Sequence, residues 1–160
     1  MVARDIADTY DVVCIGGAAI GSAVAYSLTE NPDFDGTVAV IEPDPSYEFA
    51  QTSRAQNSIR EQFSQPVNIK ICQYGLNFID NFHEHTQVDG ASPALNYRGT
   101  GYLFLAADDD AMAMFEEQMS AQHAEGAMTR MLTPGEVQAE FPYLDAVSYT
   151  HLTLPTICSV

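Results

Sequence analysis

A glycine-rich segment near the start of the chain, CIGGAAIGSAVAYSL (residues 14–28), has the residue types needed to hold a phosphate-bearing cofactor. Gly16 and Gly21 fit a G-x-G-x-x-G spacing, but Ala18 takes the middle position. Such a loop places the free N–H groups and positive dipole end of a helix against a diphosphate. Because a methyl group is a small obstacle, we expect Ala18 to keep a negative φ and the loop to bind. The candidate diphosphate-binding residues are Gly16, Gly17, Ala18, Ala19, Ile20 and Gly21.

An acidic residue follows the loop at the distance expected for recognition of a ribose. Glu42 comes directly after the apolar segment TVAVI (residues 37–41), about twenty residues beyond the loop. A carboxylate at this position accepts hydrogen bonds from ribose hydroxyls and repels the additional phosphate of NADP. NAD and FAD sites share this arrangement, so the loop and the acid predict a dinucleotide without choosing between the two.

The elements around the loop form a βαβ unit. Residues 10–16 and 37–41 are apolar and predict two buried strands, while residues 20–29 predict a helix and NPDFDG (residues 31–36) a turn. We expect Gly21 to let this helix lie close to the first strand. Two all-apolar strands joined by a helix predict a parallel sheet covered on both faces, in an α/β, Rossmann-like fold.

The rest of the chain is predicted to form a helix, a strand and two further helices, in this order. Ser64 and Pro66 are expected to begin a helix, and the 3-4-3-4 spacing predicts that its inner face carries Ile69, Cys72, Leu76, Ile79 and His83. Residues 97–106 predict a strand. Asp108–Asp110 begin a further helix, whose buried side carries Met112, Phe115 and Met119. Thr133 and Glu136 form a capping box at the start of a short helix that ends at Phe141.

The composition excludes several classes of protein. The 160 residues include 22 acidic and 6 basic side chains, a net charge of −16 that disfavours nucleic acid and anionic membranes as partners. This charge is explained either by solubility or by a saline habitat. There is no apolar run of about 18 residues to span a membrane, and no secretory leader is expected.

The cysteines and histidines predict no metal site. Three cysteines lie far apart, which argues against a zinc site or a disulfide framework and favours a reducing, cytoplasmic location. His83 and His85 are two positions apart, so on a helix they point in different directions.

Longer segments resemble a known family. YDVVCIGGAAIGSAVAYSLTE, VAVIEPDPSYEFAQTSRAQNSIREQFS, GTGYLFLA and LTPGEVQAEFPYL, which together span residues 10–145, resemble the FAD-dependent family of D-amino-acid oxidase, sarcosine oxidase and dimethylglycine dehydrogenase-like proteins. Within this family, the segments are most similar to the group described as FAD-dependent oxidoreductase domain-containing. The resemblance implies a Rossmann-like βαβ FAD-binding domain of a GR2-type flavoprotein, followed by the beginning of a substrate domain.

The resemblance also implies roles for particular residues. Gly16, Ala18 and Gly21 would flank the FAD diphosphate, and Glu42 the adenosine ribose. A polar loop reaches the diphosphate and the flavin at the positions of Thr52, Ser53 and Arg54. The chain passes the isoalloxazine ring at Ser58, Ile59 and Arg60, where a cation can stabilise a reduced, anionic flavin. From the residues alone, Arg60 is equally well interpreted as a solvated helix residue beside Glu61, and Ser53 and Arg54 as part of a polar linker.

The implied reaction is oxidation of a C–N bond in a small amine or amino acid. Hydride passes from the carbon next to nitrogen to the flavin, the imine product hydrolyses, and oxygen or another acceptor, which the sequence does not identify, reoxidises the flavin. The catalytic residues are not assigned. Two alternatives are an NAD-dependent Rossmann dehydrogenase, which the polar stretch from Thr52 to Arg60 disfavours, and a non-catalytic flavoprotein that acts as an assembly factor.

The last residues, VSYTHLTLPTICSV (residues 147–160), differ from the rest of the chain. They contain no Asp, Glu, Lys or Arg in a sequence that is 18% charged. Residues 147–156 can be written as GTC TCT TAT ACA CAT CTG ACG CTG CCG ACG, which resembles the transposase end and adapter of one kind of DNA library. We therefore expect residues 1–93 to be part of an FAD-binding domain, residues 94–146 the start of a substrate-binding domain, and residues 147–160 to be adapter-derived. The native chain is then expected to continue into a longer enzyme.

We predict that residues 147–160 have no counterpart in the source genome. Val160 followed by a stop matches the adapter triplets GTG TAG, which a native gene would share only by coincidence. The locus should be amplified from native DNA and sequenced from a library made by another method. Recovery of the same final codons and stop from that DNA would refute the adapter origin.

Overall fold

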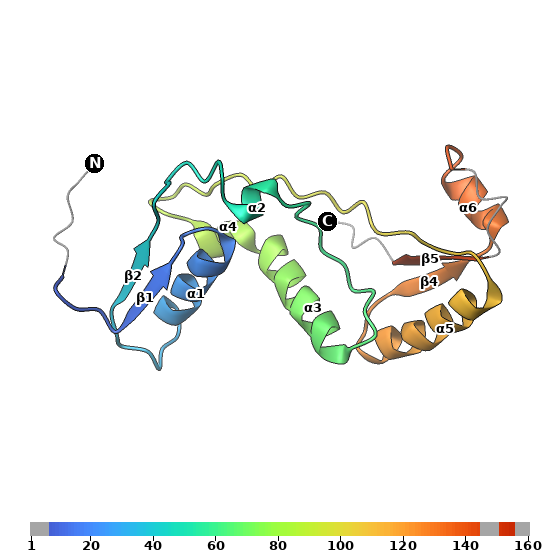
Figure 1. Ribbon diagram of the computed structural model, residues 1–160, viewed down its shortest axis with the longest axis horizontal. Coiled ribbons are helices and arrows are strands. Elements are labelled where there is room, and N and C mark those ends of the chain that lie inside the picture. The colour runs from blue at the N-terminus through green and yellow to red at the C-terminus, as the bar shows by residue number, and fades with distance from the viewer. Residues whose placement is uncertain (1–6, 145–150, 156–160) are drawn as a thin grey trace. The chain divides into compact units, whose positions relative to one another are not determined.

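The computed structural model describes residues 7–144 and 151–155 and divides the chain into two compact units (Figure 1). The first unit (residues 1–57) contains β1 (Val12–Ile15), α1 (Ala19–Thr29), β2 (Val38–Ile41) and α2 (Gln51–Arg54). The second unit (residues 58–160) contains α3 (Pro66–Asp80), α4 (Phe82–Thr86), β3 (Phe104–Ala106), α5 (Asp109–Ala124), β4 (Thr129–Leu132), α6 (Pro134–Glu140) and β5 (His151–Pro155).

The first unit is the predicted βαβ arrangement. β1 and β2 pair in parallel from Val12 opposite Val38 to Ile15 opposite Ile41, and α1 packs against both strands. The carboxylate of Asp11 accepts hydrogen bonds from the N–H and hydroxyl of Thr37, at 2.7 and 2.8 Å. These bonds hold the pKa of Asp11 below its ordinary value, chiefly through the backbone N–H, and they join the two strands where both begin.

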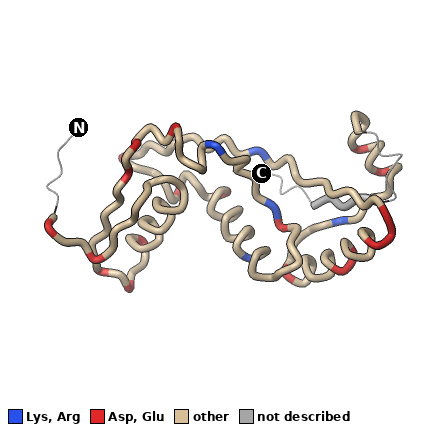
Figure 2. The backbone as a smooth tube through the Cα atoms, viewed as in Figure 1, with Lys and Arg blue, Asp and Glu red and all other residues tan. Residues whose placement is uncertain are grey.

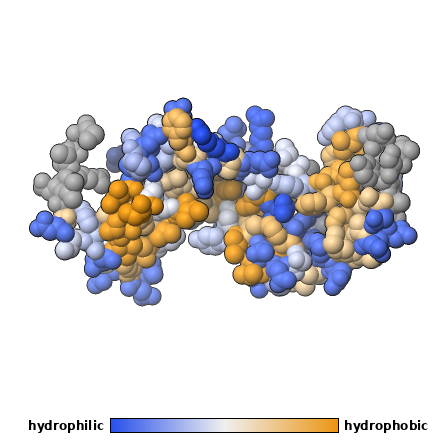
Figure 3. All heavy atoms as spheres, in the orientation of Figure 1, coloured by the Kyte–Doolittle hydropathy of each residue, from blue (hydrophilic) through white to orange (hydrophobic). Residues whose placement is uncertain are grey.

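One face of this parallel sheet is open, contrary to the prediction that both faces are covered. Val13 and Ile15 share a face of β1 and are 46% and 80% exposed, while Cys14 between them is buried. The part of the sheet that the structure describes has two strands and a single helix, which can cover only one face. Figure 3 shows hydrophobic residues gathered on the first unit; its exposed apolar residues are Val13, Ile15, Ile20, Val24, Val40, Ile41, Tyr47 and Phe49.

The second unit is built on an antiparallel sheet with the strand order β3-β5-β4. α5 packs against its strands and begins at Asp108, whose carboxylate accepts a hydrogen bond from the N–H of Ala111 at 2.8 Å. α6 packs beside β4, where Leu132 and Val137 form a small buried core. In the preceding helix, α3, Ile69 is fully buried and is followed by the partly buried Cys72, Leu76 and Ile79.

Four details of the fold differ from the predictions. α3 ends at Asp80, so His83 falls in α4 and is exposed. The cap of α3 is Gln65 rather than Ser64, without a side-chain hydrogen bond. The predicted strand over residues 97–106 is confined to residues 104–106, because Gly101 has a φ of 72° and only these three residues pair with β5. β4 and the four-residue α2 of the first unit were not predicted.

The sequence predicts that this chain's part of the cofactor domain ends at residue 93 and that its part of the substrate domain ends at residue 146. These two boundaries stay predictions. Part of the proposed adapter-derived tail, residues 151–155, forms β5. The other tail residues, 147–150 and 156–160, lie outside the described part of the chain.

Acidic residues lie along both units (Figure 2). Cys14 and Cys72 are free thiols. Among the helices of the described ranges, none is both long enough and apolar enough to cross a membrane.

The capping box at α6 provides a test of this unit. The N–H of Glu136 donates to the Thr133 hydroxyl at 3.3 Å, and the N–H of Thr133 donates to the Glu136 carboxylate at 2.7 Å. Thr133→Ala should destabilise α6 by about 1 kcal/mol, measured as faster hydrogen exchange of the α6 amides. Thr133→Ser, which keeps the hydroxyl, should retain most of the protection. Unchanged exchange in Thr133→Ala would contradict this role for the cap.

The same capping box predicts that the stability of α6 depends on pH. Hydrogen bonds from Thr133, its backbone first, lower the pKa of Glu136 below its ordinary value of 4.5. A lowered pKa in the folded state means that the stabilisation is present above the unfolded pKa and is lost as the pH falls through the folded pKa. The difference in α6 protection between the unchanged protein and Glu136→Gln should therefore shrink below pH 4.5. An equal difference at pH 7 and in acid would show that the carboxylate charge does not stabilise the helix.

Candidate functional site

The loop between β1 and α1 turns the chain at Gly16, as the glycine spacing predicts. Gly16 has a φ of 93°, which a residue with a side chain adopts only with strain. Its N–H donates to the carbonyl of Ile41 at 2.8 Å, which ties the loop to the end of β2. Ala18 is the cap residue of α1 and has a φ of −69° and a ψ of −167°. The prediction that Ala18 keeps a negative φ is therefore confirmed.

Gly21 brings α1 against the loop. A Cβ atom at this position would overlap the carbonyl oxygen of Gly16, so a side chain here requires the helix or the loop to move. The prediction that Gly21 allows close packing of helix and strand is confirmed. The first turn of α1 thus begins directly beside the end of β1.

The start of α1 presents free amide groups. The bond from the N–H of Ser22 to the carbonyl of Ala18, at 2.9 Å, is the first of the helix. The N–H groups of Ala19, Ile20 and Gly21 precede it and have no acceptor within the helix. These donors and the positive end of the helix dipole fit a diphosphate. A hydrogen bond from the Ser22 hydroxyl to the carbonyl of Gly17 ties the loop to the first turn of α1.

Glu42 lies at this loop, at the end of β2. One of its carboxylate oxygens accepts a hydrogen bond from the N–H of Gly17 at 2.8 Å, and the other accepts one from the N–H of Asp44 at 2.9 Å. Each oxygen keeps a second lone pair, so the carboxylate can still accept hydrogen bonds from ribose hydroxyls. The half-buried Glu42 thus lies beside Gly17 of the loop, and the free amides of α1 follow directly after this loop.

Sequence reasoning missed Tyr47. A Cβ atom at position 17 would lie 3.0 Å from the Tyr47 hydroxyl and 3.2 Å from the Cβ of Glu42, so this tyrosine bounds the loop and a side chain at Gly17 would require these neighbours to shift slightly. Tyr47 has a φ of 57° and ends a turn that begins at Asp44. The signal in the sequence is the turn segment PDPSY directly after Glu42.

The polar residues predicted after β2 form α2. Thr52 is half-buried and Ser53 is exposed. The guanidinium of Arg54 lies 4.6 Å from the ring centre of Phe49, and its Nε donates to the carbonyl of Glu48 at 3.4 Å. Among the hydrogen bonds of the described residues, none joins these three side chains to the glycine loop. Their role at the diphosphate and flavin stays a prediction.

Ser58 and Arg60 belong to the second unit. Ser58 is exposed, whereas Arg60 is half-buried and lies outside any helix, so its interpretation as a solvated helix residue is wrong. The guanidinium of Arg60 lies over three rings, with distances to the ring centres of 4.8 Å for Phe63, 5.6 Å for Tyr102 and 5.5 Å for Phe104. These cation–π contacts hold a positive charge in a fixed place.

The described residues bring no metal ligands together. They contain no group of three or more His, Cys, Asp and Glu side chains placed to hold an ion. His85 is stacked on Phe78, with 4.6 Å between the ring centres.

The glycine loop, the free amides of α1 and the acid at the end of β2 define a dinucleotide-binding domain. A family model described as FAD dependent oxidoreductase matches residues 11–155, and the chain belongs to this family. FAD-dependent oxidoreductase domain-containing protein 1 from Xenopus laevis is 34% identical over 138 residues, which cover 84% of this chain and 28% of that protein. The homologue from Drosophila melanogaster is 30% identical over 135 residues, or 84% of this chain and 25% of that protein. The chain thus spans between a quarter and a third of the length of these relatives.

Two solved structures show the same fold. L-proline dehydrogenase from P. horikoshii has a TM-score of 0.75 and 24% identity, with 95% of this chain and 38% of that chain covered. Glycine oxidase from Bacillus cereus has a TM-score of 0.58 and 22% identity, with 91% and 38% covered. The predicted fold class is confirmed. The cofactor of the family is FAD. The choice between NAD and FAD, which the loop and Glu42 left open, is therefore FAD.

The loop geometry predicts a small effect for one change of a methyl group, at Ala18, and a large effect for another, at Gly21. Ala18→Gly should alter FAD affinity by less than about tenfold, about 1.4 kcal/mol, because Ala18 already has an unstrained φ. Gly21→Ala should lower the affinity much further, because the added Cβ displaces α1 from Gly16. Ala18→Val should also weaken binding strongly, because a branched side chain meets the diphosphate.

Titration of the full-length apoprotein with FAD measures all three effects. Circular dichroism of each variant shows whether the fold is kept. If Ala18→Val binds FAD as well as the unchanged protein does, the diphosphate does not pass this residue and the placement of the site is wrong.

Proposed function

We propose that the full-length protein oxidises a C–N bond of a small amine or amino acid in an FAD-dependent reaction. The observation that carries the proposal is the glycine loop with Glu42 fixed across it, in a chain of the FAD-dependent oxidoreductase family. The choice of a C–N bond is supported by the names of the two structural relatives, a proline dehydrogenase and a glycine oxidase.

Residues of the first unit bind and orient the cofactor in this proposal. The amides at the start of α1 hold the diphosphate, and the free lone pairs of Glu42 accept hydrogen bonds from the adenosine ribose. Because the N–H of Gly17 orients the Glu42 carboxylate, the same loop sets the spacing between the two contacts. Thr52, Ser53 and Arg54 extend the polar contact toward the diphosphate and flavin.

The second unit contributes a positive charge. When bound, FAD supplies the acceptor for the hydride that leaves the carbon next to the substrate nitrogen. Arg60, held over three rings, is placed by the proposal where negative charge develops during this transfer. Because its orientation is fixed before the reaction, little reorganisation is required as the charge appears. We further propose a reducing, cytoplasmic location, since Cys14 and Cys72 are free thiols.

A flavoprotein that acts as an assembly factor is the alternative function. It shares the cofactor loop, so the first unit does not distinguish it from an enzyme. Turnover does distinguish them, because a structural flavin is not reduced by amines.

We expect the full-length protein to purify yellow, with the absorbance spectrum of FAD, and to bind FAD more tightly than the 160-residue chain alone. Under anaerobic conditions, at least one of sarcosine, dimethylglycine, proline, glycine or a D-amino acid should bleach the flavin. A yellow protein that none of these bleaches supports the assembly-factor alternative. A colourless protein that binds NAD tightly would overturn the cofactor site itself.

A further inference from the structure

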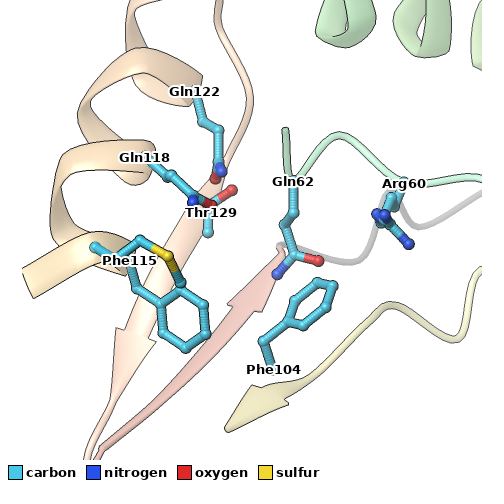
Figure 4. Close-up of a pocket in the computed structure, with 8 residues that line it drawn as sticks. Arg60, Gln62, Phe104, Phe115, Gln118, Gln122 and Thr129 are labelled. Atoms are coloured by element: carbon cyan, nitrogen blue, oxygen red, sulfur yellow. The ribbon is translucent and has the colours of Figure 1, made fainter. Parts of the chain in front are cut away.

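The second unit contains a cavity of about 330 Å³ between the α5 helix, the sheet and the segment before α3 (Figure 4). Its lining includes Arg60, Gln62, Phe104, Phe115, Gln122 and Thr129. In Figure 4, Gln122 and Thr129 are seen on the α5 side of the cavity, and Gln62 is seen opposite them, near the Phe104 ring. The volume lies near the lower end of the range for small-molecule sites.

Four polar atoms in this lining are buried without a hydrogen-bond partner among the described residues. They are the Nε of Arg60, the Oε1 atoms of Gln62 and Gln122, and the Oγ1 of Thr129. Gln62, Gln122 and Thr129 are only 8%, 3% and 5% exposed. Buried polar groups are normally paired, because an unpaired one loses its hydration and gains nothing in return. Four such atoms on one cavity therefore indicate a polar molecule that pairs with them.

The unpaired atoms define which groups that molecule carries. The Nε2 of Gln62 donates to the carbonyl of Tyr102 at 3.5 Å, whereas its Oε1 has no partner among the described residues. Together with the Oε1 of Gln122 and the hydroxyl of Thr129, it forms a set of oxygen acceptors. Such a set suits a group with N–H or O–H donors, while Phe104 and Phe115 supply an apolar wall for a carbon skeleton.

We propose that this cavity receives the side chain of an amino-acid substrate that ends in a hydrogen-bond donor, a carboxamide or a hydroxyl. The inference rests on the proposed function. Arg60 connects the two, because it lines this cavity and is also the cation that the proposed function places beside the flavin. Gln62, Gln122 and Thr129 are then the residues that determine specificity. An aliphatic side chain of the same shape would leave all three oxygens unpaired, which is a strong basis for rejection.

Matched substrates test this specificity in the full-length protein. Asparagine and leucine have nearly the same shape, as do threonine and valine, and both enantiomers of each are used. We expect kcat/KM for asparagine to exceed that for leucine by at least about tenfold. Gln122→Leu and Thr129→Val should reduce this ratio to about threefold or less by slowing the polar substrate, while Thr129→Ser keeps the hydroxyl and the preference. Gln87→Leu, the same replacement at an exposed position, should leave the ratio unchanged.

A second readout separates this inference from the proposed function. The shift in melting temperature caused by each amino acid measures binding without turnover. If no amine or amino acid bleaches the flavin, but asparagine raises the melting temperature of the unchanged protein and not that of Gln122→Leu, the proposed function fails and the polar site stands. Equal turnover of asparagine and leucine, or no binding preference in either assay, would show that water alone pairs with these atoms and would overturn the inference.

Discussion

The contact between α1 and the loop after β1 is the constraint on which the first unit depends. Because Gly21 has no side chain, the first turn of the helix begins directly beside the Gly16 carbonyl. The free amides of that turn are thereby held at the end of the strand, and Gly17 comes within hydrogen-bond distance of Glu42. The absence of a side chain at Gly21 thus sets both the place of the free helix amides, which we propose contact the diphosphate, and the orientation of Glu42, which we propose accepts hydrogen bonds from the ribose.

The second unit holds one cation, Arg60, among aromatic rings. The protein has 6 basic residues against 22 acidic ones, so the placement of each positive charge matters. Lys70 and Arg130 pair with the acids Glu125 and Glu140, at 3.0 and 2.7 Å, on partly exposed surfaces. Arg60 has aromatic rings as neighbours, and its buried Nε has no partner among the residues that the structure describes. Because no described carboxylate pairs with this guanidinium, its charge remains available to a ligand.

Sequence reasoning worked where local chemistry decides the structure. The conformation at Ala18 and the capping box at Thr133 follow from contacts within a few residues, and both were predicted. It failed where distant partners decide. Residues 97–103 have strand-like composition but pair with no strand in the described part of the chain, and Tyr47 reaches Gly17 through a turn that no periodicity reveals. The aromatic surroundings of Arg60 join residues some forty positions apart, so spacing alone did not predict them.

The central strand of the second sheet, β5, is formed by residues of the tail for which an adapter origin is predicted. Residues 151–155 pair with β3 on one side and β4 on the other through backbone hydrogen bonds, and such bonds are the same for every residue type except proline. The place between β3 and β4 therefore accepts an extended segment rather than a particular sequence. Pro155 lies opposite Thr129 in this pairing, although proline cannot donate to a ladder and is disfavoured in central strands. Formation of β5 is thus compatible with either origin of the tail, and the proline is less suited to this place than most other residues.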